Sequence, residues 1–175
     1  TIGGSLANND PAADYPAAVL ALGATIVTSK RRLKADQFFQ GLFTTALDPD
    51  EIITKIMLPV PKKAAYCKFR NPASRYALVG VFVAKRPSDV RVAVTGAGAD
   101  GVFRLSAAEA ALQKRFHPKM LDGLHVAADG LTSDLHGSAG YRAHLIAVLT
   151  RRAVEAAQAR PDKVAAQPAA LEPVS

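Results

Sequence analysis

A series of short apolar segments in the middle of the chain, joined by turns, constrains the fold more than any other feature. The Asn71-Pro72 turn and the turn at residues 86–89 separate the segments. Parallel neighbours need a crossover of about a dozen residues, so these connections predict antiparallel pairing. The β-branched and aromatic residues place the expected strands at residues 66–70, 76–85 and 90–95.

Helices are expected to follow the strands. Ser106 and Glu109 have the spacing of a capping box, which predicts a helix from Ser106 to about residue 115. A longer helix is predicted over residues 138–159, where apolar residues recur at helical spacing. We expect its arginines, Arg142 among them, to face away from the core.

The order of elements indicates an α+β fold. Residues 1–60 are expected to be the end of an α/β unit, with a short helix at residues 16–22 that stops at Gly23. Strands are predicted at residues 24–28 and 51–60, and turns or loops at residues 1–15 and 37–43.

Residues 61–160 are expected to form a C-terminal domain in which helices pack a three- or four-stranded antiparallel sheet. The Ala- and Pro-rich residues 161–175 have little apolar content and are expected to be a disordered tail. The core of the sheet domain is expected to contain Leu78, Val81, Val83, Val92, Val94, Leu112, Leu145 and Leu149.

Charge and cysteine content exclude several functions. The formal net charge is +7, but no docking motif or interleaved aromatics accompany the scattered basic residues, so nucleic-acid binding is not expected. Cys67 is the only cysteine, which excludes an intramolecular disulfide and a Cys-based metal site. A single cysteine suits a reducing, cytoplasmic setting. No run of about 18 apolar residues predicts a membrane span.

A glycine motif after the last predicted strand invites a nucleotide-binding interpretation. Residues 96–101 match G-x-G-x-x-G. A dinucleotide loop must open directly into a helix, whereas residues 102–105 precede Ser106 here. We therefore interpret the segment as a flexible strand-to-helix loop. The histidines lack the spacing of metal ligands, and we assign no catalytic residue and no metal site.

The first five residues are the better candidate for binding an anion. Gly3 and Gly4 allow backbone N–H groups to approach a phosphate closely, and the hydroxyls of Thr1 and Ser5 add donors. A plain turn is the alternative that these residues alone leave open.

Four segments, which cover residues 1 to about 158, carry a resemblance to a known family. They read TIGGSLANNDPAADYPAAVLALGA, FFQGLFTTALDPDEIITKIMLPVP, AAYCKFRNPASRYALVGVFVA and SDLHGSAGYRAHLIAVLTRRAVEAA. In this order they resemble the FAD-binding medium subunits of molybdenum hydroxylases, such as aerobic carbon monoxide dehydrogenase, and the FAD-binding domain of xanthine dehydrogenase. The resemblance makes residues 1–60 the C-terminal part of the FAD-binding subdomain. It makes residues 61–160 the C-terminal α+β domain of the flavoprotein subunit.

The resemblance also implies which residues bind FAD. The opening segment would lie on the pyrophosphate, and Asp14 would accept hydrogen bonds from a hydroxyl of the cofactor. Tyr76 would lie against the isoalloxazine, with packing against the long helix as the alternative. The complete implied set is Thr1, Ile2, Gly3, Gly4, Ser5, Asp14, Ile53, Lys68 and Tyr76.

The implied function is electron transfer within a larger enzyme. A large subunit with a molybdenum–pterin cofactor would oxidise the substrate, and the iron–sulfur clusters of a small subunit would pass electrons through FAD to an external acceptor. Relatives carry a further N-terminal subdomain with another glycine-rich FAD loop, so the isolated 175-residue chain is expected to be inactive. The alternative is a flavin-free assembly module that docks to partner subunits.

Overall fold

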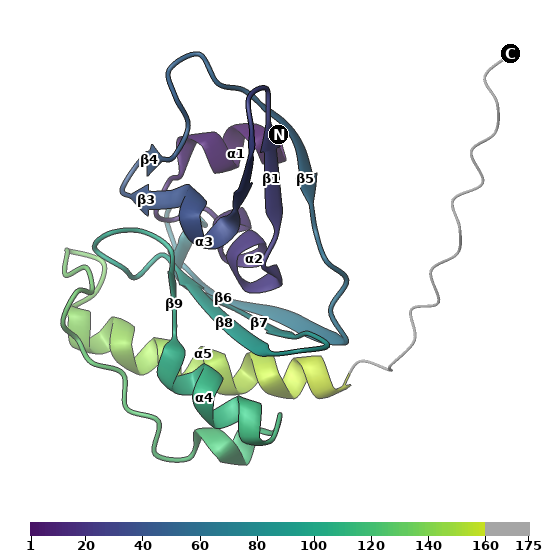
Figure 1. Ribbon diagram of the computed structural model, residues 1–175. Coiled ribbons are helices and arrows are strands. Elements are labelled where there is room, and N and C mark those ends of the chain that lie inside the picture. The colour runs from purple at the N-terminus through teal and green to yellow at the C-terminus, as the bar shows by residue number, and fades with distance from the viewer. Residues whose placement is uncertain (160–175) are drawn as a thin grey trace, which may run out of the picture.

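In the computed structural model, which describes residues 1–159, the largest sheet is antiparallel and has the order β6-β7-β8-β9 (Figure 1). Its register pairs Cys67 with Val81 and Val81 with Val94. The antiparallel sheet predicted from the short connections is therefore confirmed. Its strands are β6 (Lys63–Arg70), β7 (Ala77–Lys85), β8 (Val90–Thr95) and β9 (Phe103–Arg104).

The N-terminal part contains a second antiparallel sheet and a small ribbon. The sheet has the order β2-β1-β5, with β1 (Thr25–Thr28), β2 (Arg32–Lys34) and β5 (Ile53–Met57). The strand predicted at residues 51–60 is thus shorter than expected. The segment predicted as a loop at residues 37–43 is regular instead, because α3 (Ala35–Phe38) leads into the ribbon of β3 (Phe39–Gly41) and β4 (Thr44–Thr45).

Two short helices precede the first strand. The predicted helix is confirmed as α2 (Tyr15–Leu22), and it ends at Gly23, whose φ of 63° is the left-handed conformation that glycine favours. The prediction of turns throughout residues 1–15 is wrong, because Ile2–Asn8 forms α1. Thr1 Oγ1 accepts a hydrogen bond from the Gly4 N–H at 3.1 Å and caps this helix.

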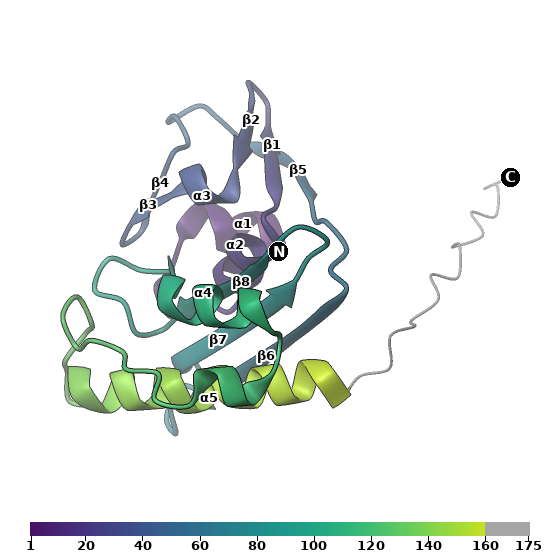
Figure 2. The ribbon, with the colours of Figure 1, turned by 60° about the horizontal axis from the view of Figure 1, so that its bottom comes forward.

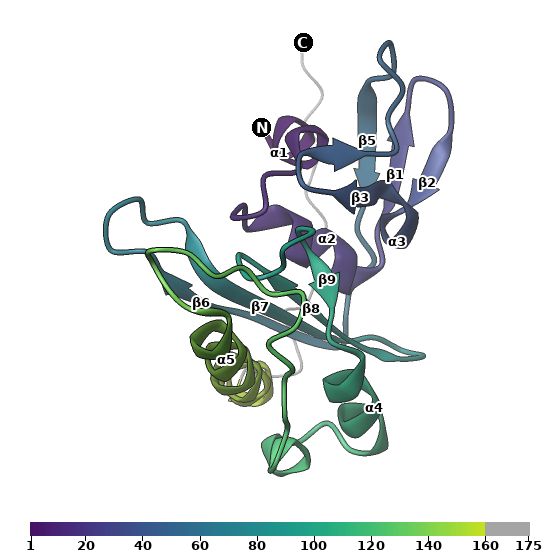
Figure 3. The same ribbon diagram turned by 90° about the vertical axis from the view of Figure 1, so that its left-hand side faces the viewer.

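Helices cover both faces of the large sheet (Figure 3). The valines Val79, Val81 and Val83 point to one face and form a core with α4 (Ser106–Lys114) and α5 (Ala139–Ala159). Figure 2 shows these two helices on the same side of β6, β7 and β8. The opposite face carries α2, and the small residues Ala84 and Ala93 allow that helix to approach closely.

The predicted core of the sheet domain is confirmed, because every one of its residues is buried. The long helix begins as predicted, and the Ser138 hydroxyl accepts from the Tyr141 N–H at 3.2 Å. The capping-box prediction is wrong in detail, since the Glu109 carboxylate accepts from the Val92 N–H at 2.9 Å and pairs with Arg104. The predicted disordered tail at residues 161–175 lies outside the described residues.

Arg142 contradicts the prediction that it faces away from the core. It is 3% exposed, and its Nη1 donates to the backbone oxygens of Leu78 at 2.7 Å and Gly96 at 2.8 Å. Its Nη2 lies 2.8 Å from Asp134 Oδ2. A buried guanidinium is stable here because carbonyls and a carboxylate take up its donors.

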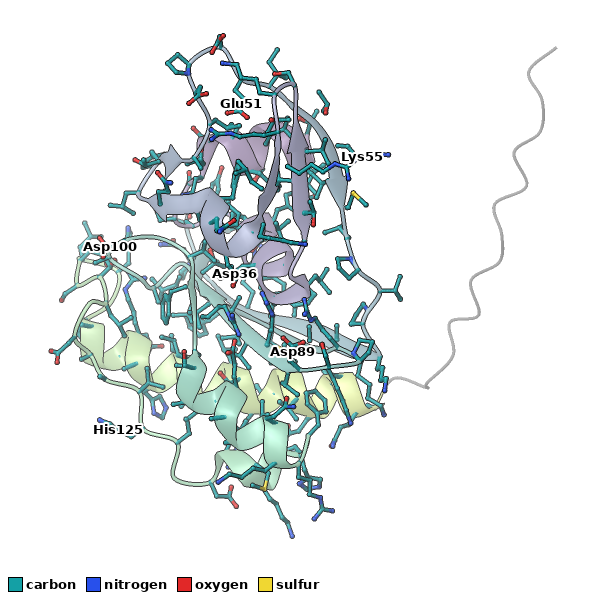
Figure 4. All side chains as sticks on the ribbon, viewed as in Figure 1. Asp36, Glu51, Lys55, Asp89, Asp100 and His125 are labelled. Carbon is teal, nitrogen blue, oxygen red and sulfur yellow. The ribbon has the colours of Figure 1, made fainter. Side chains whose placement is uncertain are left out.

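Glu51 forms a polar centre in the N-terminal part, where Figure 4 labels it. Its side chain is 0% exposed. Arg31 donates to both carboxylate oxygens, at 3.0 and 2.9 Å, and the Thr28 hydroxyl donates at 2.5 Å. These bonds, together with the Asp48 backbone N–H, outweigh burial and lower the pKa of Glu51 from 4.5 to about 2.

The depressed pKa of Glu51 predicts a stability that depends on pH. The contribution of this carboxylate is fully present above its unfolded-state pKa of 4.5 and is lost as the pH falls through about 2. Between these values, the free energy of unfolding should fall less steeply in Glu51→Gln than in the wild type. Urea unfolding at several pH values measures the slope. Asp100→Asn, at an exposed carboxylate outside this cluster, is the control substitution.

Candidate functional site

The loop that precedes α2 is fastened to the end of strand β8. The Gly96 N–H donates to the Pro11 carbonyl at 2.8 Å. The Thr95 hydroxyl lies 3.0 Å from the same oxygen and 2.7 Å from the Ala13 carbonyl oxygen. The large sheet therefore fixes the backbone that leads into Asp14.

Asp14 is held by two side chains of strand β6. Lys68 Nζ lies 3.0 Å from Asp14 Oδ1 and 2.8 Å from Oδ2. The Tyr66 hydroxyl donates to Oδ1 at 2.5 Å. The Lys68 side chain is 17% exposed and that of Asp14 is 44% exposed, so one edge of the carboxylate faces outward. The structure thus joins two of the predicted site residues, from separate parts of the chain, in one ion pair.

Tyr66 was missing from the residues expected to form the site. It is half-buried, and burial together with the hydrogen bond to Asp14 raises its pKa well above the ordinary value of 10.0. Tyr66 therefore stays protonated and donates its hydrogen bond at any physiological pH. Its position two residues before Lys68, on the same face of one strand, is the sequence signal that could have identified it.

The opening segment starts a helix instead of forming a free loop. Gly3 and Gly4 lie in the first turn of α1, and a Cβ added to Gly3 would meet nothing within 4 Å. The backbone of this turn is therefore open to the outside, while Leu6 anchors the helix in the core. Ile53 lies on β5 against the N-terminal core. Within residues 1–159, no hydrogen bond or ion pair joins Thr1–Ser5 or Ile53 to Asp14.

A cavity of about 430 Å³ lies where the two halves of the chain meet. Tyr76 lines it and is 55% exposed, so this predicted site residue faces the cavity instead of packing in the core. The cavity is also lined by Asp10, Leu42, Gly96 and Arg142. Its lining combines apolar surface with a few polar groups, as ligand sites commonly do.

Asp134 and Arg142, which form an ion pair, both line this cavity. Burial raises the pKa of Asp134, but the backbone N–H of His136 and the guanidinium of Arg142 outweigh it and lower that pKa below 3.8. The carboxylate therefore stays ionised and orients Arg142. Neither residue was predicted as part of the site, because no local pattern brings a loop aspartate and a helical arginine together.

The glycine segment at residues 96–101 has a packing role. Gly96 has a φ of 82°, and a Cβ there would lie 2.4 Å from the Ala77 carbonyl oxygen. A Cβ on Gly98 would lie 2.3 Å from the Gly101 carbonyl oxygen. Close backbone contacts therefore require glycine at these positions, and the segment leads into β9 before the helix, whereas the sequence predicted a loop running from strand to helix.

Residues 1–159 contain neither a cluster of metal ligands nor a membrane-spanning helix. No three His, Cys, Asp or Glu side chains in this range come together as metal ligands would. None of the helices in the same range combines the length and the hydropathy of a bilayer-crossing segment.

Two known protein families together match nearly the whole of the described chain. Residues 1–61 match the FAD binding domain in molybdopterin dehydrogenase. Residues 64–157 match the CO dehydrogenase flavoprotein C-terminal domain.

Individual relatives agree with these families. The chain is 37% identical over 174 residues to the nicotine 6-hydroxylase medium subunit of Paenarthrobacter nicotinovorans, covering 91% of this chain and 61% of the relative. It is 33% identical over 175 residues to the carbon monoxide dehydrogenase medium chain of Afipia carboxidovorans, with the same coverage.

A solved structure has the same fold. The reconstituted CO dehydrogenase from Oligotropha carboxidovorans superposes with a TM-score of 0.80 at 31% identity, over 92% of this chain and 62% of that one. The chain thus spans about three fifths of the length of these relatives. The chain belongs to the CO dehydrogenase flavoprotein family and carries, in its first 61 residues, a match to the FAD binding domain in molybdopterin dehydrogenase.

Proposed function

We propose that this chain forms the FAD-contacting part of the medium subunit of a molybdenum hydroxylase resembling carbon monoxide dehydrogenase. The observation that carries the proposal is the Asp14–Lys68 ion pair, at 2.8 Å, which joins two residues of the implied FAD site. The family matches at residues 1–61 and 64–157 support it, because Asp14 lies in the first and Lys68 in the second.

The residues present fit FAD. The open first turn of α1 offers the Gly3 backbone and the hydroxyls of Thr1 and Ser5 to a phosphate, and a side chain at Gly3 would fill this space. The outward edge of the Asp14 carboxylate can accept a hydrogen bond from a cofactor hydroxyl. The cavity beside Tyr76 has an exposed aromatic face that suits a flat ring.

Each residue of the proposed site then has a role. Thr1–Ser5 bind the pyrophosphate, Asp14 accepts from a hydroxyl, and Lys68 pairs with Asp14 and orients it. Ile53 supplies apolar contact, and Tyr76 covers the ring. When bound, FAD would supply the redox chemistry, taking electrons from iron–sulfur clusters and giving them to an external acceptor.

The names of the relatives as medium subunits and medium chains favour partner chains. We propose a large subunit with a molybdenum–pterin cofactor and a small iron–sulfur subunit as these partners, in the cytoplasm. The separate family matches at residues 1–61 and 64–157 support a division into an FAD-binding part at residues 1–60 and a C-terminal domain at residues 61–160.

The test is the visible absorption spectrum of the purified holoenzyme that contains this chain. A flavin band that is released with the medium subunit supports the proposal. A medium subunit without flavin would contradict it and would favour the alternative, an assembly module that docks to partner subunits.

Tyr76 gives a prediction about reactivity. In the holoenzyme, Tyr76→Ala should change the rate of flavin reoxidation by the acceptor several-fold, because the exposed ring at the cavity would no longer cover the isoalloxazine. Reduction of the molybdenum site by substrate should stay unchanged. Stopped-flow absorbance measures both rates, and Tyr141→Ala on α5 is the control. Unchanged reoxidation with a lower melting temperature would show that Tyr76 only packs.

A further inference from the structure

Tyr66 reaches across the sheet in a way that only glycine at position 80 permits. Tyr66 pairs with Phe82 in the register, and the two rings stack with centroids 6.2 Å apart. Its hydroxyl, however, lies over Gly80 on the same strand as Phe82. A Cβ added to Gly80 would lie 2.2 Å from Tyr66 Oη and 2.9 Å from Thr95 Cγ2. Because Cβ atoms do not approach so closely, any side chain at position 80 would displace the hydroxyl.

The hydrogen bond from Tyr66 decides which oxygen of Asp14 remains available. A carboxylate offers about four lone-pair positions, two on each oxygen. Tyr66 and Lys68 together occupy Oδ1, at 2.5 and 3.0 Å, whereas Lys68 alone contacts Oδ2, at 2.8 Å. The free acceptor position is therefore on Oδ2, on a side chain that is partly open to the outside.

The backbone around Asp14 is fixed from the same face. Thr95, which lies beside Gly80 in the register, holds the carbonyls of Pro11 and Ala13. The side chain and the backbone of Asp14 are thus both held by residues of strands β6 and β8. With both fixed, a bond to Oδ2 costs little additional ordering.

We propose that Tyr66, lodged over Gly80, is a positioning residue for flavin binding, which turns Asp14 Oδ2 toward a hydroxyl group of the cofactor. The proposal rests on the proposed function, because it assumes that Asp14 contacts FAD. It adds a residue of the C-terminal domain that acts on the cofactor only through Asp14.

The test uses the deflavinated holoenzyme titrated with FAD, with the dissociation constant measured by flavin fluorescence. Tyr66→Phe keeps the ring and removes the hydroxyl, and it should raise the dissociation constant about tenfold, as expected for a hydrogen bond to a charged group. Gly80→Ala should raise it similarly by displacing the hydroxyl. Tyr141→Phe is the matched control, because Tyr141 packs against Phe69 on the other face of the sheet.

A double-mutant cycle separates positioning from general stability. In an Asp14→Ala background, Tyr66→Phe should have no further effect on the FAD dissociation constant, since its partner is absent. The inference would be wrong if the two substitutions raised the dissociation constant by independent factors that multiply. It would also be wrong if Tyr66→Phe bound FAD like the wild type. Either result would leave the proposed function intact. A wild-type holoenzyme that takes up no FAD would overturn the proposed function as well.

Discussion

Arg142→Met is expected to lower the free energy of unfolding by about 3–5 kcal/mol, the cost of breaking a buried, hydrogen-bonded charge. Methionine fills much of the space of the arginine stem but has no donors. The Leu78 and Gly96 carbonyl oxygens, now 2.7 and 2.8 Å from Nη1, would lose their guanidinium partner. Asp134 would lose its cation, although it is partly exposed and can be solvated.

Chemical denaturation of the wild type and of Arg142→Met measures this loss. Arg152→Met is the control, because Arg152 lies on the same helix, α5, and is exposed. A surface substitution of this kind should change the free energy of unfolding by less than about 0.5 kcal/mol. Similar losses of unfolding free energy in the two variants would mean that the contacts of Arg142 with Leu78, Gly96 and Asp134 contribute nothing specific to stability.

Lys68→Ala is expected to weaken FAD binding to the holoenzyme about 100-fold, as truncation of one member of a hydrogen-bonded charge pair commonly does. Lys68 gives Asp14 two hydrogen bonds, at 3.0 and 2.8 Å, and is largely buried. In the proposed site, Asp14 would then lose its cation and its orientation toward the cofactor. Loss of the ammonium would also remove positive charge near an anionic ligand.

Flavin content per subunit and the FAD dissociation constant measure this effect. Lys55→Ala is the matched control, because Lys55 is exposed on β5 and points away from the molecule in Figure 4. Flavin retention equal to that of the wild type in Lys68→Ala would contradict the role of the ion pair in the site.

Local sequence rules were sufficient for the sheet domain. Two short turns predicted the antiparallel pairing, and Leu78, Val81 and Val83 of β7 are buried as expected. The same local rules did not predict helix α1, because its two glycines each disfavour a helix by about 1 kcal/mol relative to alanine. The burial of Leu6 and the cap from Thr1 compensate for this, and neither is visible without the packed structure.

In the candidate site, too, the sequence supplied some residues and the tertiary structure supplied their arrangement. Resemblance to a family supplied Asp14 and Lys68, and the structure supplied their contact at 2.8 Å. The contribution of Tyr66 depends on Gly80, which follows it by 14 positions along the chain and leaves space only because β6 and β7 are adjacent. No pattern within one segment encodes such a pair.

By itself, the sequence determined the antiparallel sheet, the long helix and the apolar core, since these follow from turn length and from periods of two and 3.6 residues. Arg142 shows what it left open. Its spacing from Ile146 and Leu149 places it on the buried stripe of α5, but its charge predicted an exposed side chain. Only the tertiary structure could decide, because a charge is buried where distant backbone carbonyls and a carboxylate converge to satisfy it.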